Sequence, residues 1–263
     1  MRRPTRTRLS PPIEILAALA IVFFAVPVVG LLQRAPWSDL ADDLTDPVVR
    51  DALWLSLVCS LGATGLAFVL GLPLAWVLAR AHVPGRRVVR ALVLLPMVLP
   101  PVVGGVALLL AFGRRGLVGQ YLDQWFGIRL PFTTGGAILA EAFVAMPFFV
   151  IVVEAGLRSL DRRYEDAAAT LGARRLTTFR RVVLPLIAPS LVAGAALTWA
   201  RALGEFGATI LFAGNLEGET QTMPLAIFVE LQTNLGGAIA LSLVLLAVSV
   251  VVLVSLRERW FPA

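Results

Sequence analysis

The sequence contains no lysine, because every one of its 23 basic residues is an arginine. A phosphate-binding loop of the form GxxxxGK[ST] needs its lysine at the nucleotide phosphates, so this chain cannot hold ATP in that way. The single cysteine, Cys59, lies inside an apolar run and permits neither an intrachain disulfide nor a cysteine metal cluster. The single histidine, His82, lies in a polar loop, and no HExxH or Gly-x-Ser-x-Gly pattern accompanies it. We therefore expect no catalytic site, and no metal or cofactor bound by this chain.

Charged residues are also scarce, at 15% of the chain, whereas hydrophobic residues make up 58%. With a mean hydropathy of +0.84, this composition is that of a membrane protein. The pI near 11 could suggest a nucleic-acid partner. The arginines, however, lie in short loops between apolar runs, which is typical of positive loops that stay in the cytoplasm. We expect membrane lipid and no nucleic acid among the partners, and a multi-pass protein of the cytoplasmic membrane.

Six apolar runs are long enough to cross a bilayer. The first is too long for a signal-peptide core, and no convincing cleavage site follows it. Residues 1–12 are then a cytoplasmic arm, 13–256 a single transmembrane domain and 257–263 a cytoplasmic tail. The expected spans are approximately 13–32, 52–79, 91–112, 133–157, 186–213 and 235–256.

The third expected span is interrupted by Pro96, Pro100 and Pro101, and then by Gly104 and Gly105. A broken helix is tolerated in a membrane only where protein or water covers the freed backbone groups. The break therefore favours a place in the bundle interior or the pore wall over contact with lipid.

The distribution of arginine sets the expected orientation. Segments assigned to the inside hold 17 arginines, outside loops hold five, and Arg201 lies within a span. The loop 113–131 carries Arg114, Arg115 and Arg129 against this rule. It is placed outside because any other choice breaks the parity of the neighbouring spans. Six spans with both termini in the cytoplasm are therefore predicted.

The longest polar interval is 161–185, with the sequence DRRYEDAAATLGARRLTTFRRVVLP. Asp161 can cap a helix, 164–171 are mostly good helix formers, and Gly172 stands where a left-handed C-terminal residue belongs. Helical spacing resumes over 173–184. The loop 158–185 is therefore predicted to hold a short helix of small residues between two spans, a shape that a partner protein can bind.

This loop resembles the cytoplasmic signature loop of binding-protein-dependent ABC importer permeases. The pattern of that family is Glu-Ala-Ala, three residues, Gly, nine residues, Ile, any residue, Leu-Pro. Two substitutions are conservative: an aspartate replaces the glutamate, with Glu165 just before it, and a valine replaces the isoleucine. The matching positions are Asp166, Ala167, Ala168, Gly172, Val182, Leu184 and Pro185. The resemblance implies an all-α integral membrane fold, the six-transmembrane-helix type I ABC importer permease; the alternative is an ordinary interfacial amphipathic helix.

Ionisable residues within the expected spans are Glu141, Glu154, Arg201 and Glu205. An ionised group at the centre of a bilayer costs about 2.5–3.5 kcal/mol on insertion scales, so each needs an explanation. Arg201 and Glu205 are four residues apart and can pair on one helix face. Two interpretations remain open: the pair is structural, or this face lines the translocation path or its gate.

The segment 201–215 (RALGEFGATILFAGN) resembles the fifth-helix segment of oxyanion importer permeases. Together with 219–227, it is most similar to the molybdate branch, and the sulfate and thiosulfate permeases are near neighbours. The similarity covers roughly residues 50–255. It makes Arg201, Glu205 and Thr209 candidates for the translocation path or gate.

The family resemblance implies a homodimer with a pore at its two-fold interface. Two cytoplasmic ATPase subunits, which carry the ATP and Mg, would bind the signature-loop helix through Glu165 and the matching positions. An extracytoplasmic binding protein would deliver molybdate to the outer face. The alternatives are a sulfate or thiosulfate permease, a secondary transporter or channel that works alone, and an intramembrane enzyme, for which catalytic residues are lacking.

Overall fold

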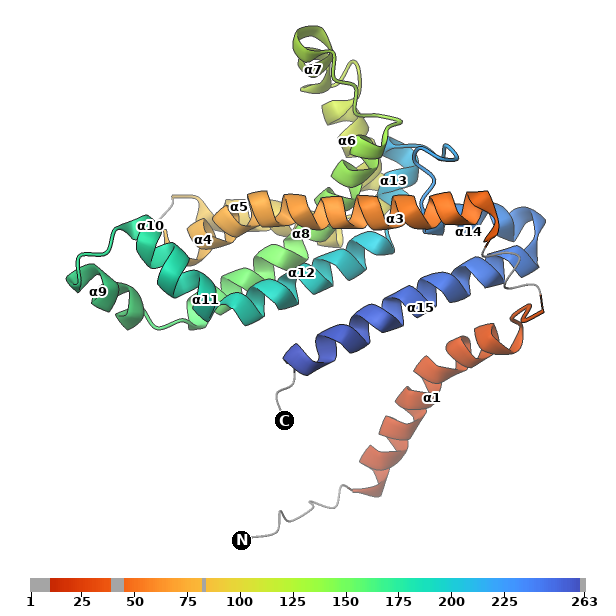
Figure 1. Ribbon diagram of the computed structural model, residues 1–263, viewed down its shortest axis with the longest axis horizontal. Coiled ribbons are helices and arrows are strands. Elements are labelled where there is room, and N and C mark those ends of the chain that lie inside the picture. Colours follow the sequence, from red (N-terminus) through yellow and green to blue (C-terminus); the bar gives the residue numbers. More distant parts are fainter. Residues whose placement is uncertain (1–9, 39–44, 82–83, 261–263) are drawn as a thin grey trace.

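A computed structural model of the chain describes residues 10–38, 45–81 and 84–260, and all regular structure in these ranges is helical. The arm residues 1–9, His82 and the tail residues 261–263 lie outside the described residues. In Figure 1, the long helices α3, α8, α12 and α15 run along the long axis of the molecule. The helices are α1 (Pro11–Gln33), α3 (Pro47–Leu66), α4 (Leu72–Arg80), α5 (Arg86–Val98), α6 (Pro101–Phe112), α7 (Gly119–Phe126), α8 (Thr134–Ser159), α9 (Arg163–Thr170), α10 (Arg175–Thr178), α11 (Leu184–Leu186), α12 (Ala188–Leu203), α13 (Gly207–Phe212), α14 (Met223–Thr233) and α15 (Leu235–Trp260), with the π-helical segments η1 (Ala67–Gly71) and η2 (Phe179–Val183).

Helix α8 is the centre of the bundle and packs against α3, α4, α12 and α13. Its start is capped by Thr133, whose hydroxyl accepts the backbone N–H of Gly136 at 3.1 Å. The buried face is rich in alanine, which lets neighbouring helices approach closely. Phe149 is fully buried, and a Cβ added at Gly71 or Gly194 would lie 3.0 or 3.3 Å from its ring. Glycine at these two positions therefore brings η1 and α12 against α8.

The second expected span forms one long helical rod over residues Pro47–Arg80, through α3, η1 and α4. Asp46 caps its start, because the carboxylate accepts the N–H of Val48 at 2.8 Å. The C-terminal end of the rod lies beside the loop 158–185. There, Leu78 packs in a buried cluster with Leu157 of α8. The rod therefore extends from the carboxylate end of the molecule to the end that carries the loop (Figure 1).

The third expected span is broken, as its prolines predict, and it begins earlier than expected. Helix α5 starts at Arg86 and continues through Pro96, and the chain then becomes extended at Leu99 and Pro100 before α6 begins. Each of these two residues precedes a proline, and the proline ring disfavours the helical conformation of the residue before it. The sequence analysis placed this broken span in the bundle interior or the pore wall. Gly104 and Gly105 of α6 are buried, as that expectation requires, whereas no residue of α5 is buried against the described part of the chain.

The fifth expected span is divided, which the sequence analysis did not predict. Helix α12 ends at Leu203, three residues connect it to α13, and α13 packs against α6. A Cβ added at Gly207 would lie 2.9 Å from Cβ of Pro101, so the breaks in the third and fifth spans meet. The segment between the fifth and sixth expected spans contains a further helix, α14, whose Met223 is fully buried.

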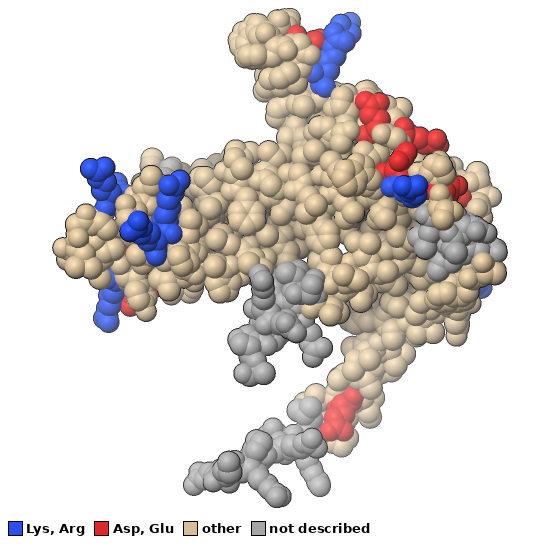
Figure 2. Space-filling model, viewed as in Figure 1, with Lys and Arg blue, Asp and Glu red and all other residues tan. Residues whose placement is uncertain are grey.

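Within the described residues, four helices are long and apolar enough to cross a membrane, and the number is five if Arg175–Leu186 and Ala188–Leu203, bent by 71°, count as one span. The chain is therefore a multi-pass membrane protein. Helix α1 is apolar but has no buried residue, and Figure 1 shows it apart from the central bundle, next to α15. Figure 2 shows arginines gathered at the end that carries α9 and α10, and carboxylates at the opposite end, near α14.

Candidate functional site

The signature loop folds into a short helix, α9, that ends at a left-handed glycine. At its start, the carboxylate of Asp161 accepts the N–H of Arg163 at 3.0 Å. At its end, Gly172 has φ +78°, and the N–H of Ala173 donates to the carbonyl of Ala168 at 3.0 Å. This bond and the left-handed residue together satisfy the last carbonyl groups of a helix. The cap and the turn are therefore those that the sequence predicts.

Helix α9 is accessible along its whole length, because none of its residues is buried. Asp166 and Ala167 are exposed, Ala168 is half-buried, and Leu171 at the end of the helix is 88% exposed. Figure 1 places α9 and α10 at one end of the bundle, far from α13 and α14. The first half of the signature thus has small side chains and an exposed leucine at the surface of the chain.

A cavity of about 700 Å³ lies between the loop and α4. The rings of Trp76 and Phe179 meet edge to face in its wall, with centroids 4.9 Å apart. The residues that line it include Trp76, Glu165, Asp166, Ala169, Leu176 and Phe179. The cavity therefore has an aromatic wall beside two acidic residues of the signature loop.

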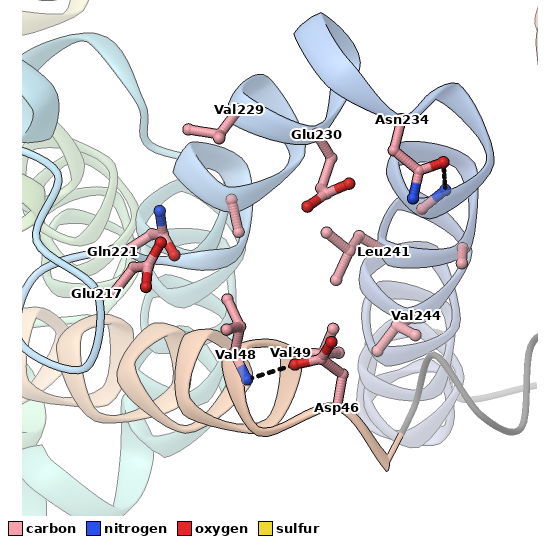
Figure 3. A pocket seen from close by; sticks show the side chains of 13 residues that line it. Asp46, Val48, Val49, Glu217, Gln221, Val229, Glu230, Asn234, Leu241 and Val244 are labelled. Carbon is pink, nitrogen blue, oxygen red and sulfur yellow. Dashed lines mark hydrogen bonds between the residues drawn. The ribbon is translucent and has the colours of Figure 1, made fainter.

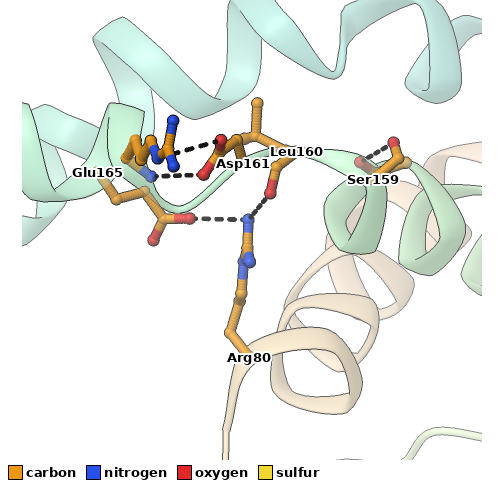
Figure 4. Close-up of polar contacts among 7 residues, drawn as sticks. Arg80, Ser159, Leu160, Asp161 and Glu165 are labelled. Carbon is orange, nitrogen blue, oxygen red and sulfur yellow. Dashed lines mark hydrogen bonds and ion pairs between the residues drawn. The ribbon is translucent and has the colours of Figure 1, made fainter.

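Arg80, at the end of the long rod, contacts two residues of the loop segment (Figure 4). Its Nη2 lies 2.9 Å from Oε1 of Glu165 and donates to the carbonyl of Leu160 at 3.0 Å. The Arg80 side chain is only 11% exposed, so this ion pair is shielded from water more than most surface pairs. Arg80 therefore connects α9 directly to the end of α4.

The second half of the signature leads into α12. Val182 and Leu184 are half-buried and Pro185 is exposed, while Val183 between them is fully buried against α8 and α4. The chain then bends by 71° before α12 begins. These positions therefore form the connection between α9 and the fifth span.

Two of the intramembrane glutamates have different surroundings. Oε1 of Glu154 is shared by three guanidinium groups: Arg90, Arg158 at 2.7 Å and Arg86 at 3.6 Å. Glu141 is 1% exposed in α8, and its Oε2 has no hydrogen-bond partner among the described residues. Glu154 thus balances one of the three positive charges of an arginine cluster near the loop end, whereas Glu141 is buried in the bundle.

The predicted pair of Arg201 and Glu205 is formed, with Nη2 and Oε2 2.7 Å apart. The two residues do not share a helix, because Glu205 follows the end of α12. Its other oxygen, Oε1, accepts the N–H of Ala208 at 2.9 Å and so caps α13. Thr209 is fully buried in α13, and its hydroxyl has no hydrogen-bond partner among the described residues. The three candidates therefore surround the break in the fifth span.

Two of the arginines that oppose the charge rule pair with one carboxylate. Asp123 in α7 lies 2.8 Å from Nε of Arg129 and 3.1 Å from Nε of Arg114. The hydrogen bond from Arg129, followed by its charge and by Arg114, holds the pKa of the Asp123 carboxyl below its usual range. One carboxylate is therefore shared by two of the three arginines in this loop.

An acidic cavity of about 160 Å³ lies at the other end of the molecule, between α3, α14 and α15. Figure 3 shows Asp46, Glu217 and Glu230 around it, with Asn234 near the start of α15. The molecule is thus charged oppositely at its two ends, with arginines around the signature loop and carboxylates here (Figure 2).

Residues 67–260 match the family described as the inner membrane component of binding-protein-dependent transport systems. The chain belongs to this family. The molybdenum transport system permease protein ModB of Mycobacterium tuberculosis is 46% identical over 243 residues, which cover 92% of each chain. The sulfate transport system permease protein CysT of Salmonella typhimurium is 42% identical over 227 residues, covering 86% of this chain and 82% of the relative. Among solved structures, a bacterial ABC transporter involved in the import of the acidic polysaccharide alginate aligns with a TM-score of 0.71 at 20% identity, covering 94% of this chain and 93% of that chain.

Membership of this permease family makes the chain a transport subunit and not an enzyme. The signature positions are a prediction from the sequence alone. The sequence did not indicate Arg80 as the partner of Glu165, or Arg86, Arg90 and Arg158 as the partners of Glu154. The sequence feature that could have indicated these ion pairs is the group of arginines at the end of the second span and directly after it. A carboxylate at the end of a span and arginines in the adjacent loop are natural partners, but the sequence does not specify which ones meet.

Proposed function

We propose that this chain is the permease subunit of an ATP-driven importer that moves molybdate across the cytoplasmic membrane. The observation that carries the mechanism is the exposed helix α9, capped at both ends and fastened by Arg80 to the long rod. The substrate is inferred from the 46% identity to a molybdenum permease over 92% of the chain. The coupling residues are those of the signature: Glu165, Asp166, Ala167, Ala168, Gly172, Val182, Leu184 and Pro185.

The proposed topology has six crossings, with α5 and α6 together forming the third, and both termini in the cytoplasm. It is supported by the arginines at the loop end and the carboxylates at the opposite end. Two copies form a pore at their two-fold interface. Helices α1 and α5 have no fully buried residue among the described part of the chain, and their exposed apolar side chains support an assembly larger than one subunit.

The partners follow from the energetics of the cargo. Moving a dianion inward against an inside-negative potential costs about 4.6 kcal/mol per 100 mV. A chain without lysine has no phosphate-binding loop of its own, so two cytoplasmic ATPase subunits supply ATP and Mg and bind the two α9 helices. An extracytoplasmic binding protein delivers the substrate to the outer face.

In the proposed mechanism, closure of the ATPases displaces α9. The contact of Arg80 with Glu165 carries the movement into α4 and α3, and the bent connection at Pro185 carries it into α12. Arg201 lies in the last turn of α12 and Glu205 just after the helix ends, beside the point where the breaks in the third and fifth spans meet. This junction is the proposed gate.

Replacing Arg80 with glutamine should uncouple the loop from the rod. The change removes the ion pair with Glu165 and the hydrogen bond to Leu160, and a hydrogen bond from a charged group contributes about 1.5–3 kcal/mol. We expect ATP-driven uptake in reconstituted vesicles to fall about tenfold, with ATP hydrolysis largely retained. Arg87→Gln, at an exposed position in α5, is the matched control and should transport normally. If the Arg80→Gln variant takes up molybdate at the wild-type rate, Arg80 does not couple α9 to α4.

The substrate is tested by competition. A sulfate permease is the principal alternative, because a sulfate relative is 42% identical. We expect labelled molybdate uptake, with the binding protein present, to persist in a hundredfold excess of sulfate. Complete inhibition by sulfate would favour the sulfate assignment. Uptake by the purified chain without an ATPase would instead indicate a secondary transporter or channel.

A further inference from the structure

A groove separate from the signature loop lies between α4, α5 and α8, with a volume of about 410 Å³. Its walls are mainly apolar, and its polar members are Arg90, Glu154 and Arg158. Ile151 in the wall is 39% exposed, so the groove opens onto the surface of the chain. The apolar residues that line it are Leu78, Val93, Leu94, Val150, Ile151 and Ala155.

The mouth of this groove carries excess positive charge. Arg86, Arg90 and Arg158 all contact Oε1 of Glu154, so one carboxylate is shared by three guanidinium groups and two positive charges remain. The three arginine side chains are 35%, 40% and 44% exposed, whereas the Glu154 side chain is 6% exposed. The guanidinium groups therefore keep free N–H donors at the surface. Guanidinium matches phosphate oxygens in planar, two-point hydrogen bonding.

The depth of the cluster fits a lipid headgroup. Arg86 is the first residue of α5 and Arg158 lies in the last turn of α8, so the arginines lie where these helices leave the apolar region. The apolar walls continue from them toward the middle of α8, at Val150 and Ile151. A small soluble anion would use the charged mouth only, whereas an amphipathic molecule would occupy both parts of the groove.

We propose that this groove binds an anionic phospholipid of the cytoplasmic leaflet. The phosphate lies against Arg86, Arg90 and Arg158, and an acyl chain lies along the apolar wall between α5 and α8. The assignment of the leaflet rests on the proposed orientation of the permease. The bound lipid holds α5 against α8 close to the loop that the ATPase binds. It supplies the negative charge that Glu154 alone leaves unbalanced.

The test uses the purified full-length permease in detergent, titrated with phosphatidylglycerol or with phosphatidylcholine and followed by native mass spectrometry and thermal unfolding. We expect phosphatidylglycerol to bind and stabilise the wild type more than phosphatidylcholine does. Arg86→Gln should weaken the apparent affinity for phosphatidylglycerol about fivefold, because each basic residue near a lipid surface contributes about 1 kcal/mol. Arg86 is chosen because its 3.6 Å contact with Glu154 is the longest of the three, so Arg90 and Arg158 still neutralise the carboxylate.

The matched control is Arg181→Gln, which removes the same charge from an exposed position in η2. It should bind phosphatidylglycerol like the wild type. The proposal is overturned if Arg86→Gln keeps wild-type affinity, if both variants lose affinity equally, or if inorganic phosphate reproduces the stabilisation and so identifies a free-anion site. The assay contains no ATPase, binding protein or molybdate. Its failure therefore leaves the transport proposal intact, and failure of transport leaves the lipid result intact.

Discussion

Gly172→Val is expected to abolish ATP-coupled molybdate uptake while leaving the permease inserted in the membrane. Gly172 has φ +78°, where a β-branched residue is strongly disfavoured, and a side chain there would meet nothing within 4 Å. The substitution therefore acts through the backbone alone, at a cost of about 1–2 kcal/mol or more for the left-handed conformation. The turn after α9 would open and displace the helix from its partner. Uptake by vesicles reconstituted with the ATPase should fall below about a tenth of the wild-type rate.

Two matched variants separate coupling from general strain. Gly172→Asn should keep substantial uptake, because asparagine tolerates the left-handed conformation better than valine does. Gly127→Val places the same strain after α7, where Gly127 has φ +66° and also has open space around it. That variant should transport close to normally. Wild-type uptake by Gly172→Val, or equal loss in Gly127→Val, would contradict the coupling role of the signature turn.

Arg201→Met is expected to destabilise the folded permease more than other single substitutions in its neighbourhood. It leaves Glu205 buried without its ion-pair partner, and breaking a buried pair from one side costs about 3–5 kcal/mol. We expect the low end of this range, about 3 kcal/mol, because the Arg201 side chain is 30% exposed. Thermal unfolding of the purified protein in detergent measures the loss.

The double variant Arg201→Met with Glu205→Gln should recover much of this stability. The glutamine is neutral, and its Oε1 can still accept the N–H of Ala208 that caps α13. Failure to recover would show that Glu205 is not the source of the instability. If the double variant is stable, its molybdate uptake tests the proposed gate. Loss of uptake would indicate that Arg201 and Glu205 lie on the translocation path, whereas normal uptake would indicate that the pair has a structural role only.

Local features of the loop could be predicted from sequence because they depend on neighbouring residues. Asp161 caps α9 and Gly172 ends it through bonds that span a few positions of the chain. The break at Leu99 and Pro100 is likewise local, because each residue precedes a proline. These features follow from side-chain and backbone chemistry, independently of how the helices pack.

The features that sequence analysis missed depend on contacts between distant segments. Glu154 meets Arg90 across 64 positions, and Arg80 meets Leu160 across 80. Apolar composition alone could not separate α12 from α13, because the break is stabilised by Glu205 and by the packing of Gly207 on Pro101. Hydropathy gives the length of a span, whereas packing against another span decides where it is divided.

The side of the membrane on which α9 lies tests the central claim most directly. Ala169 is exposed in α9 and can be replaced with cysteine, while the native Cys59 is fully buried and should stay unreactive. A membrane-impermeant maleimide applied to intact cells should leave the Ala169→Cys variant unlabelled and should label it once the cytoplasmic membrane is permeabilised. Labelling from outside intact cells would place α9 away from any cytoplasmic ATPase and would contradict the account.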